Sequence, residues 1–178
     1  MKILLHICCA PCSIYPVETL LSEGLGISGF FYNNNIHPYT EYVKRKDALA
    51  QYAKLIGLEV IFRDDYDLEG FLRATAFREA NRCVFCYFER LNATALYAKE
   101  AGYDSFTTTL LYSIYQKHDL IKEIGESAGK SAGIPFYYRD FRPGWKHGVS
   151  ESRRLELYRQ KYCGCIYSEK ERYLKKAS

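Results

Sequence analysis

The sequence predicts a single α/β domain with three layers, because short apolar runs alternate with helical segments along its 178 residues. Strands that alternate with helices need crossover connections, so we expect a mainly parallel sheet with helices on both faces. Hydrophobic residues make up 48% of the chain, which is enough to bury a core without disulfides. These observations predict a Rossmann-like (HUP-like) fold with about five strands.

The expected strands are five apolar runs of the length that buried strands have. In chain order they cover residues 2–8, 27–32, 58–62, 105–111 and 136–139. The second run ends in three consecutive asparagines and the third follows Gly57, which is typical of strands bounded by turns. Sheets of this kind bind ligands beyond the carboxyl ends of their strands.

The expected helices show apolar residues at helical spacing, and several end at a glycine. Tyr42, Leu49 and Ala53, for example, share one helical face before Gly57. Four helices are expected at residues 13–23, 41–56, 68–77 and 119–132. A long helix through residues 88–98 is expected to end at Gly102, and a last helix passes through residues 155–162.

We expect a cytoplasmic protein that does not enter the membrane. The chain has no run of about 20 apolar residues, and its first residues lead directly into a strand rather than a signal peptide. No glycine-rich phosphate-binding motif is present, so a nucleotide cofactor is not indicated. Disulfides are rare in the reducing cytosol, and clustered cysteines there favour metal or redox chemistry.

The seven cysteines form three groups, each spaced so that its sulfurs can bind one metal centre. The groups are Cys8, Cys9 and Cys12, then Cys83 and Cys86, and finally Cys163 and Cys165. Seven thiolates exceed one tetrahedral zinc site and fall short of two, whereas a 4Fe-4S cluster with a second metal beside it can use them all. We therefore expect the groups to converge on iron, although spacing leaves open which thiolate serves which centre.

A thioredoxin-like dithiol oxidoreductase is an alternative interpretation. Cys9-Ala10-Pro11-Cys12 stands between a strand and a helix, where the helix N-terminus would lower the thiol pKa. In this interpretation Cys9 and Cys12 carry the activity and the other cysteines are incidental.

Several further motifs accompany the cysteines. They are His6-Ile7-Cys8-Cys9-Ala10-Pro11-Cys12-Ser13, Tyr32-Asn33, Asn35-Ile36-His37-Pro38, Arg82-Cys83-Val84-Phe85-Cys86-Tyr87, Thr108-Thr109-Leu110-Leu111, Tyr115-Gln116-Lys117-His118 and Tyr158-Arg159-Gln160-Lys161-Tyr162-Cys163-Gly164-Cys165. Together they resemble the epoxyqueuosine reductases of the QueH type, to about Ser168. The long cysteine-containing blocks make the resemblance specific.

The resemblance implies an oxidoreductase of queuosine biosynthesis and tRNA processing. Such enzymes remove the epoxide oxygen of epoxyqueuosine at the wobble position of tRNA, independently of cobalamin. The resemblance also implies a 4Fe-4S cluster with a neighbouring mononuclear iron, and the electrons are expected to come from an external donor. A further alternative is a tRNA-binding module without catalytic activity, in which the cysteines bind a structural zinc.

Proton delivery to the departing oxygen requires a nearby acid. His37 follows the expected second strand, and histidine titrates near neutral pH. We therefore expect His37 to be the proton donor, with Tyr115 and His118 as further candidates for the catalytic site.

The C-terminal part of the chain is the expected tRNA-binding surface. Residues 139–178 carry 11 Lys and Arg against 5 Asp and Glu, and residues 146–178 are expected to form a basic helical segment of the single domain 1–178. Phosphate contacts supply much of the affinity for nucleic acids. The residues expected to bind the substrate are Asn33, Asn35, Arg139, Arg142 and Lys146.

Overall fold

The computed structural model describes residues 1–174, so the last residues of the predicted basic segment, 175–178, lie outside the described residues. The elements in chain order are β1 (Lys2–His6), α1 (Ala10–Ser22), β2 (Gly26–Phe31), α2 (Tyr39–Ile56), β3 (Val60–Phe62), α3 (Leu68–Thr75), α4 (Arg82–Glu100), β4 (Ser105–Thr108), α5 (His118–Ala132), α6 (Trp145–Arg154) and α7 (Ile166–Tyr173), with the 3-10 turns η1 (Glu79–Asn81), η2 (Thr109–Tyr112) and η3 (Arg142–Gly144).

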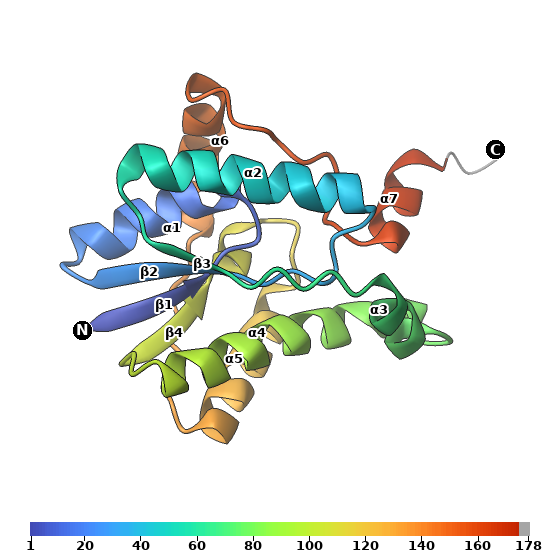
Figure 1. Cartoon of the computed structure of the whole chain (residues 1–178), viewed down its shortest axis with the longest axis horizontal. Helices are drawn as coiled ribbons and strands as arrows, with labels where there is room; N and C mark the ends of the chain where they lie inside the picture. Colours follow the sequence, from blue (N-terminus) through green and yellow to red (C-terminus); the bar gives the residue numbers. More distant parts are fainter. Residues whose placement is uncertain (175–178) are drawn as a thin grey trace.

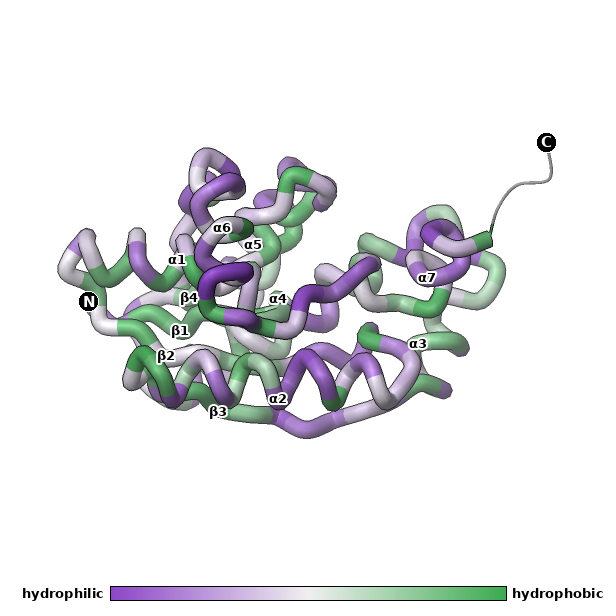
Figure 2. Tube along the Cα trace, turned by 90° about the horizontal axis from the view of Figure 1, so that it is seen from above, coloured by the Kyte–Doolittle hydropathy of each residue, from purple (hydrophilic) through white to green (hydrophobic). Residues whose placement is uncertain are grey.

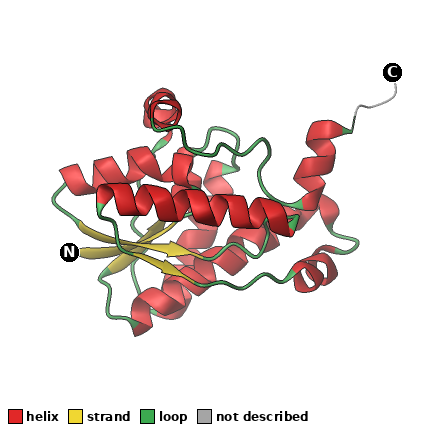
Figure 3. Cartoon of the chain, turned by 45° about the horizontal axis from the view of Figure 1, so that its top comes forward, coloured by secondary structure: helices red, strands yellow, loops and turns green. Residues whose placement is uncertain are grey.

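The sheet has the strand order β3-β2-β1-β4, and all neighbouring strands within residues 1–174 are parallel. On the central strand β1, Leu4 pairs with Ser28 on one side and with Phe106 on the other. The strands therefore run in the same direction, and their carboxyl ends lie together at one end of the sheet (Figure 3).

Helices cover both faces of the sheet, which confirms the predicted three-layer α/β fold (Figure 1). The helices α1, α2 and α6 lie on one face, and α4 and α5 pack together on the other. The residues of β1 from Ile3 to His6 are fully buried between these layers. Figure 1 places α3 and α7 beyond the carboxyl ends of the strands.

The predicted fifth strand, residues 136–139, is wrong. Phe136 makes an isolated bridge to Phe106, and two backbone hydrogen bonds hold the segment there, from Phe106 to the Pro135 carbonyl and from Tyr137 to the Phe106 carbonyl. The chain then leaves the sheet, and the Tyr137 hydroxyl donates to Glu23 at 2.7 Å. The described part of the chain therefore has four strands.

The predicted last helix through residues 155–162 is also wrong. The helix α6 covers residues 145–154, at the start of the segment 146–178 that was expected to be helical, and it ends before Leu155. The following segment is extended because its polar groups bond to other elements: the carbonyls of Tyr162 and Cys163 accept from Arg45 of α2 instead of from a helical turn. This largely hydrophilic connection leads from α6 towards α7 (Figure 2).

The remaining helices lie close to their predicted positions. The helix α2 ends at Gly57, whose left-handed backbone (φ 67°) glycine adopts readily. The helix α4 starts earlier than expected, so Cys83 and Cys86 lie in its first two turns rather than before it. Among residues 1–174, none of the helices is long and apolar enough to cross a membrane.

Candidate metal centre

A cavity of about 860 Å³ opens beyond the carboxyl ends of the strands, where the sequence predicted the site. The loop after β1, the helices α1, α3, α4, α6 and α7, the η2 loop and the segment before α7 all contribute residues to its lining. Its lining includes six of the seven cysteines, namely Cys8, Cys12, Cys83, Cys86, Cys163 and Cys165. The fold therefore brings the three cysteine groups to one place, with Cys9 buried directly behind Cys8 and Cys12.

The first three cysteines form a compact set at the end of β1. The sulfurs of Cys8, Cys9 and Cys12 lie within 4.8 Å of one another, and those of Cys8 and Cys9 are 3.8 Å apart. Cys9 caps α1 with an extended backbone, and the backbone N–H of Cys8 donates to the Thr109 hydroxyl at 3.1 Å. Because β1 and β4 are neighbours, this bond fixes the loop that presents the thiols.

The pKa values of the three thiols are shifted in different directions. Hydrogen bonds with Cys12 and Cys9 hold the pKa of Cys8 well below its usual value. Burial raises the pKa of Cys9, and the hydrogen bond with Cys8 raises that of Cys12. The pKa is thus lowered at Cys8, whereas a thioredoxin-like mechanism needs a lowered pKa at Cys9 or Cys12.

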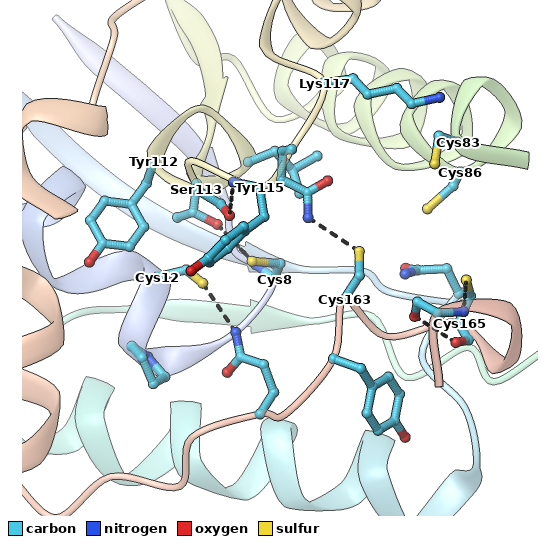
Figure 4. Close-up of a pocket in the computed structure, with 18 of the residues that line it drawn as sticks. Cys8, Cys12, Cys83, Cys86, Tyr112, Ser113, Tyr115, Lys117, Cys163 and Cys165 are labelled. Carbon is cyan, nitrogen blue, oxygen red and sulfur yellow. Dashed lines mark hydrogen bonds between the residues drawn. The ribbon is translucent and has the colours of Figure 1, made fainter. Parts of the chain in front are cut away.

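The other four cysteines face the same cavity from two segments. Cys83 and Cys86 stand one turn apart on α4, whereas Cys163 and Cys165 flank Gly164 just before α7, so that Cys165 caps that helix (Figure 4). Within residues 1–174, no three of these sulfurs lie as close together as those of the first set.

A buried arginine faces this second set. Arg90 of α4 is 2% exposed, and its Nη2 donates to the Cys86 sulfur at 3.0 Å. It forms no ion pair with a carboxylate in the described part of the chain. A buried cation is costly unless negative charge neutralises it. Burial raises the pKa of the Cys86 thiol to about 12, so the thiol is neutral unless it binds a metal.

Two glutamine amides also point at sulfur, and sequence reasoning missed both. Gln160 Nε2 donates to the sulfurs of Cys9 at 2.9 Å and Cys12 at 3.3 Å. Gln116 Nε2 donates to the Cys163 sulfur at 3.2 Å, and Tyr87 holds the amide oxygen of Gln116. Both glutamines stand in the motif blocks of the sequence, but only the fold reveals which sulfurs they reach.

A buried ion pair fastens the segment that carries Cys163 to α2. Arg45 Nε is 2.7 Å from Glu41 Oε1, and its Nη1 and Nη2 donate to the carbonyls of Cys163 and Tyr162 at 2.8 and 3.0 Å. The Tyr158 hydroxyl donates to the other oxygen of Glu41. This network replaces the helix that the sequence predicted.

His37 lies outside the cavity lining. Its ring is 1% exposed, and it packs against Phe71 at 4.8 Å between ring centroids. Its Nδ1 accepts from the Ile166 backbone at 3.4 Å, and its backbone N–H donates to the Gly164 carbonyl at 2.8 Å. Burial lowers the pKa of His37 to about 4, so its imidazole is neutral at pH 7.

The other two predicted catalytic side chains lie apart from each other. Tyr115 lines the cavity and is 80% exposed. His118 begins α5 outside the lining, with its Nε2 3.0 Å from the Tyr138 hydroxyl, and burial lowers its pKa.

The predicted substrate-binding residues are also separated. Asn35 lines the cavity, whereas Asn33 is buried and donates to the Ile7 carbonyl at 2.9 Å. Outside the lining, Arg139 pairs with Glu23 and Arg142 with Asp140, and Lys146 is exposed on α6. The cationic side chains that do line the cavity are Arg82, Arg90, Lys117, Arg159, Lys161 and Arg172, against the single carboxylate of Glu171.

The family model for the epoxyqueuosine reductase QueH matches residues 3–171. The chain belongs to the QueH family. It is 36% identical over 172 residues to the epoxyqueuosine reductase QueH of Dehalococcoides mccartyi, covering 97% of this chain and 94% of that protein. It is 35% identical over 185 residues to that of Thermotoga maritima, covering 98% and 94%. These matches confirm the predicted family and the predicted class of enzyme, an oxidoreductase.

A solved structure shares the fold of this QueH family member. The U34-tRNA thiolase NcsA from Methanococcus maripaludis, with its [4Fe-4S] cluster, superimposes with a TM-score of 0.61 at 20% sequence identity. The match covers 94% of this chain and 61% of that chain. At this identity the likeness shows the fold alone.

Proposed function

We propose that this chain is an epoxyqueuosine reductase that acts on the modified wobble base of tRNA, with a 4Fe-4S cluster and an adjacent mononuclear iron. The observation that carries the proposal is the convergence of three distant cysteine groups on one cavity in a QueH family chain. An external electron donor and a cytoplasmic location are parts of the same proposal.

The donor set fits iron held by thiolates. Arg90 is a buried cation beside Cys86 without a carboxylate partner among residues 1–174. Because an unpaired buried cation is destabilising, negative charge in the cavity would stabilise it. Thiolates that bind iron provide that charge. Amide groups of Gln160 and Gln116 complete the surroundings, because hydrogen bonds to the sulfurs tune iron–sulfur centres.

The spacing of the sulfurs favours a division of the two centres. Sulfurs about 2.3 Å from one tetrahedral metal lie roughly 3.8 Å apart, which is the distance between Cys8 and Cys9. We therefore assign Cys8, Cys9 and Cys12 to the single iron. The four more widely spaced thiols are assigned to the cluster, which needs ligands around a larger body. They are Cys83, Cys86, Cys163 and Cys165.

Removal of the epoxide oxygen breaks two C–O bonds and forms a C=C bond, and it consumes two electrons and two protons as the oxygen leaves as water. When bound, the iron centres supply single electrons and a Lewis acid for the oxygen. The cationic lining attracts the phosphates of the tRNA. Of the three proposed proton donors, Tyr115 is the one that lines the cavity, and its hydroxyl can deliver a proton there.

The test is incubation of anaerobically reconstituted protein with tRNA that carries epoxyqueuosine and a strong reductant, followed by mass analysis of the nucleosides. We expect the modified nucleoside to lose the mass of one oxygen. Protein loaded with zinc is the matched control and should leave the mass unchanged. An unchanged mass with iron-loaded protein, under conditions in which the tRNA binds, would refute the proposed reaction.

A further inference from the structure

Tyr115 has an unusual position for a tyrosine beside a cavity. Its side chain is 80% exposed, although it lines the same cavity as Cys8 and Cys12. Its hydroxyl makes no hydrogen bond within residues 1–174, so the ring is not held there by its polar end. Figure 4 shows Tyr115 and Tyr112 on the side of the cavity that holds Cys8 and Cys12.

Trp145 packs against this ring. The ring centroids of Tyr115 and Trp145 are 5.4 Å apart at an interplanar angle of 85°, an edge-to-face contact. Trp145 is fixed in turn by Tyr112, which packs at 5.1 Å and donates its hydroxyl to the Trp145 carbonyl at 3.0 Å. The close approach depends on Gly148, because a Cβ there would lie 2.3 Å from the Tyr112 hydroxyl oxygen.

The Tyr115 loop is anchored to the metal-binding part of the chain. The backbone N–H of Tyr115 donates to the Ser113 hydroxyl at 3.2 Å, and the neighbouring Gln116 is bonded to Cys163. Because hydrogen bonds hold the loop, the exposed aromatic ring stays in one position and is accessible to a ligand. Aromatic side chains in such places stack on unpaired bases.

The charge of the cavity that Tyr115 lines fits a nucleic acid. Lys117, Arg159 and Lys161 line the cavity with exposed side chains and form no ion pair in the described residues. Unpaired cations that line the same cavity as an exposed aromatic ring fit the backbone phosphates and an unstacked base of a nucleic acid.

We infer that Tyr115, supported by Trp145, is the stacking surface for the heterocycle of the modified wobble base. The base lies against the open face of the ring, its epoxide-bearing substituent reaches into the cavity towards Cys8 and Cys12, and its phosphates contact the three free cations. This inference rests on the proposed function and adds the residue that binds the base.

The experiment measures the Kd of epoxyqueuosine-bearing tRNA by fluorescence anisotropy for iron-loaded wild type, Tyr115→Ala and Tyr115→Phe. Loss of one stacked base should weaken binding by about 10- to 100-fold in Tyr115→Ala, whereas Tyr115→Phe keeps the ring and the affinity. The control is Leu55→Ala, which truncates an exposed apolar side chain on α2 and should leave the Kd unchanged. Iron and sulfide contents should equal those of wild type in all three variants.

An unchanged Kd in Tyr115→Ala, or an equal loss in Tyr115→Phe, would overturn the stacking role. Turnover of wild-type protein decides the proposed function separately, because it does not depend on the variants. Turnover of Tyr115→Phe with saturating tRNA reports on the hydroxyl alone: a loss there with an unchanged Kd assigns proton delivery to the hydroxyl and leaves the ring as the stacking surface.

Discussion

The amide nitrogen of Gln160 lies 2.9 Å from the sulfur of Cys9 and donates a hydrogen bond to it. The two residues are 151 positions apart in the chain, and the contact joins the segment before α7 to the start of α1. The same nitrogen also reaches Cys12 at 3.3 Å. A donor aimed at two sulfurs of the proposed single-iron set stabilises the more negative, reduced state of that centre.

Replacement of this amide should therefore shift a reduction potential. In Gln160→Met we expect the midpoint potential of the single iron to fall by on the order of 50 mV, because a hydrogen bond to a charged group is lost. Spectroelectrochemical titration of the loaded protein measures the shift. Gln51→Met on the exposed side of α2 is the matched control, and equal potentials in both variants would contradict the role of Gln160.

Arg90 should be needed for the cluster. Its guanidinium is the buried cation beside Cys86, so Arg90→Met leaves the negative charge of the ligand set without a partner. We expect this variant to retain less than half of the wild-type sulfide, whereas Arg90→Lys retains most of it. Sulfide and iron analysis after identical reconstitution gives the answer, with Lys99→Met at the exposed end of α4 as the control. Full sulfide content in Arg90→Met would count against this role.

The Arg45–Glu41 pair should contribute strongly to stability. Removal of one partner of a buried ion pair costs about 3–5 kcal/mol, and Arg45→Met also frees the carbonyls of Tyr162 and Cys163. Urea unfolding of the metal-free protein should show this loss, while Lys54→Met, an exposed residue of the same helix, should be neutral. Equal unfolding midpoints for the two variants would show that the pair does not hold the segment.

The buried His37 predicts a loss of stability in acid. Burial lowers the pKa of its folded-state imidazole from 6.5 to about 4, so between these values the unfolded chain binds a proton that the folded chain excludes. Stability should thus fall with decreasing pH, by about 1.6 kcal/mol between pH 6.5 and 5 for this group. His37→Phe should lose that part of the pH dependence in urea unfolding, and His147→Gln, an exposed histidine, should keep it. Identical pH dependence in wild type and His37→Phe would contradict this assignment.

Local patterns in the sequence were sufficient for most of the fold. The helix α2 and the strand β1 followed from spacing and from runs of apolar residues, because each buries one continuous face. The predicted last helix through residues 155–162 was wrong because tertiary hydrogen bonds outweigh its helical spacing, above all those of Arg45 to the carbonyls of Tyr162 and Cys163. The fifth strand failed because just two backbone bonds tie residues 135–137 to β4.

The convergence of the three cysteine groups could be predicted from the sequence, but the geometry around their sulfurs could not. The motif spacing indicated seven metal-binding cysteines, and the position after β1 indicated the correct edge of the sheet. The residues that surround the sulfurs were missed, because Gln160 and Arg90 act on cysteines through contacts that exist only in the folded chain. Their signal in the sequence was proximity to Cys163 and Cys86, which alone does not show which sulfur a side chain reaches.

The most direct test of the central claim is the iron and acid-labile sulfide content of anaerobically reconstituted protein, measured for wild type, Cys9→Ser and Cys86→Ser. Two centres in one cavity predict about five iron and four sulfide per wild-type chain, four of each in Cys9→Ser, and loss of nearly all sulfide in Cys86→Ser. Stoichiometric zinc without sulfide in the wild-type protein, or equal losses in the two variants, would contradict the division of the cysteines into two iron sites.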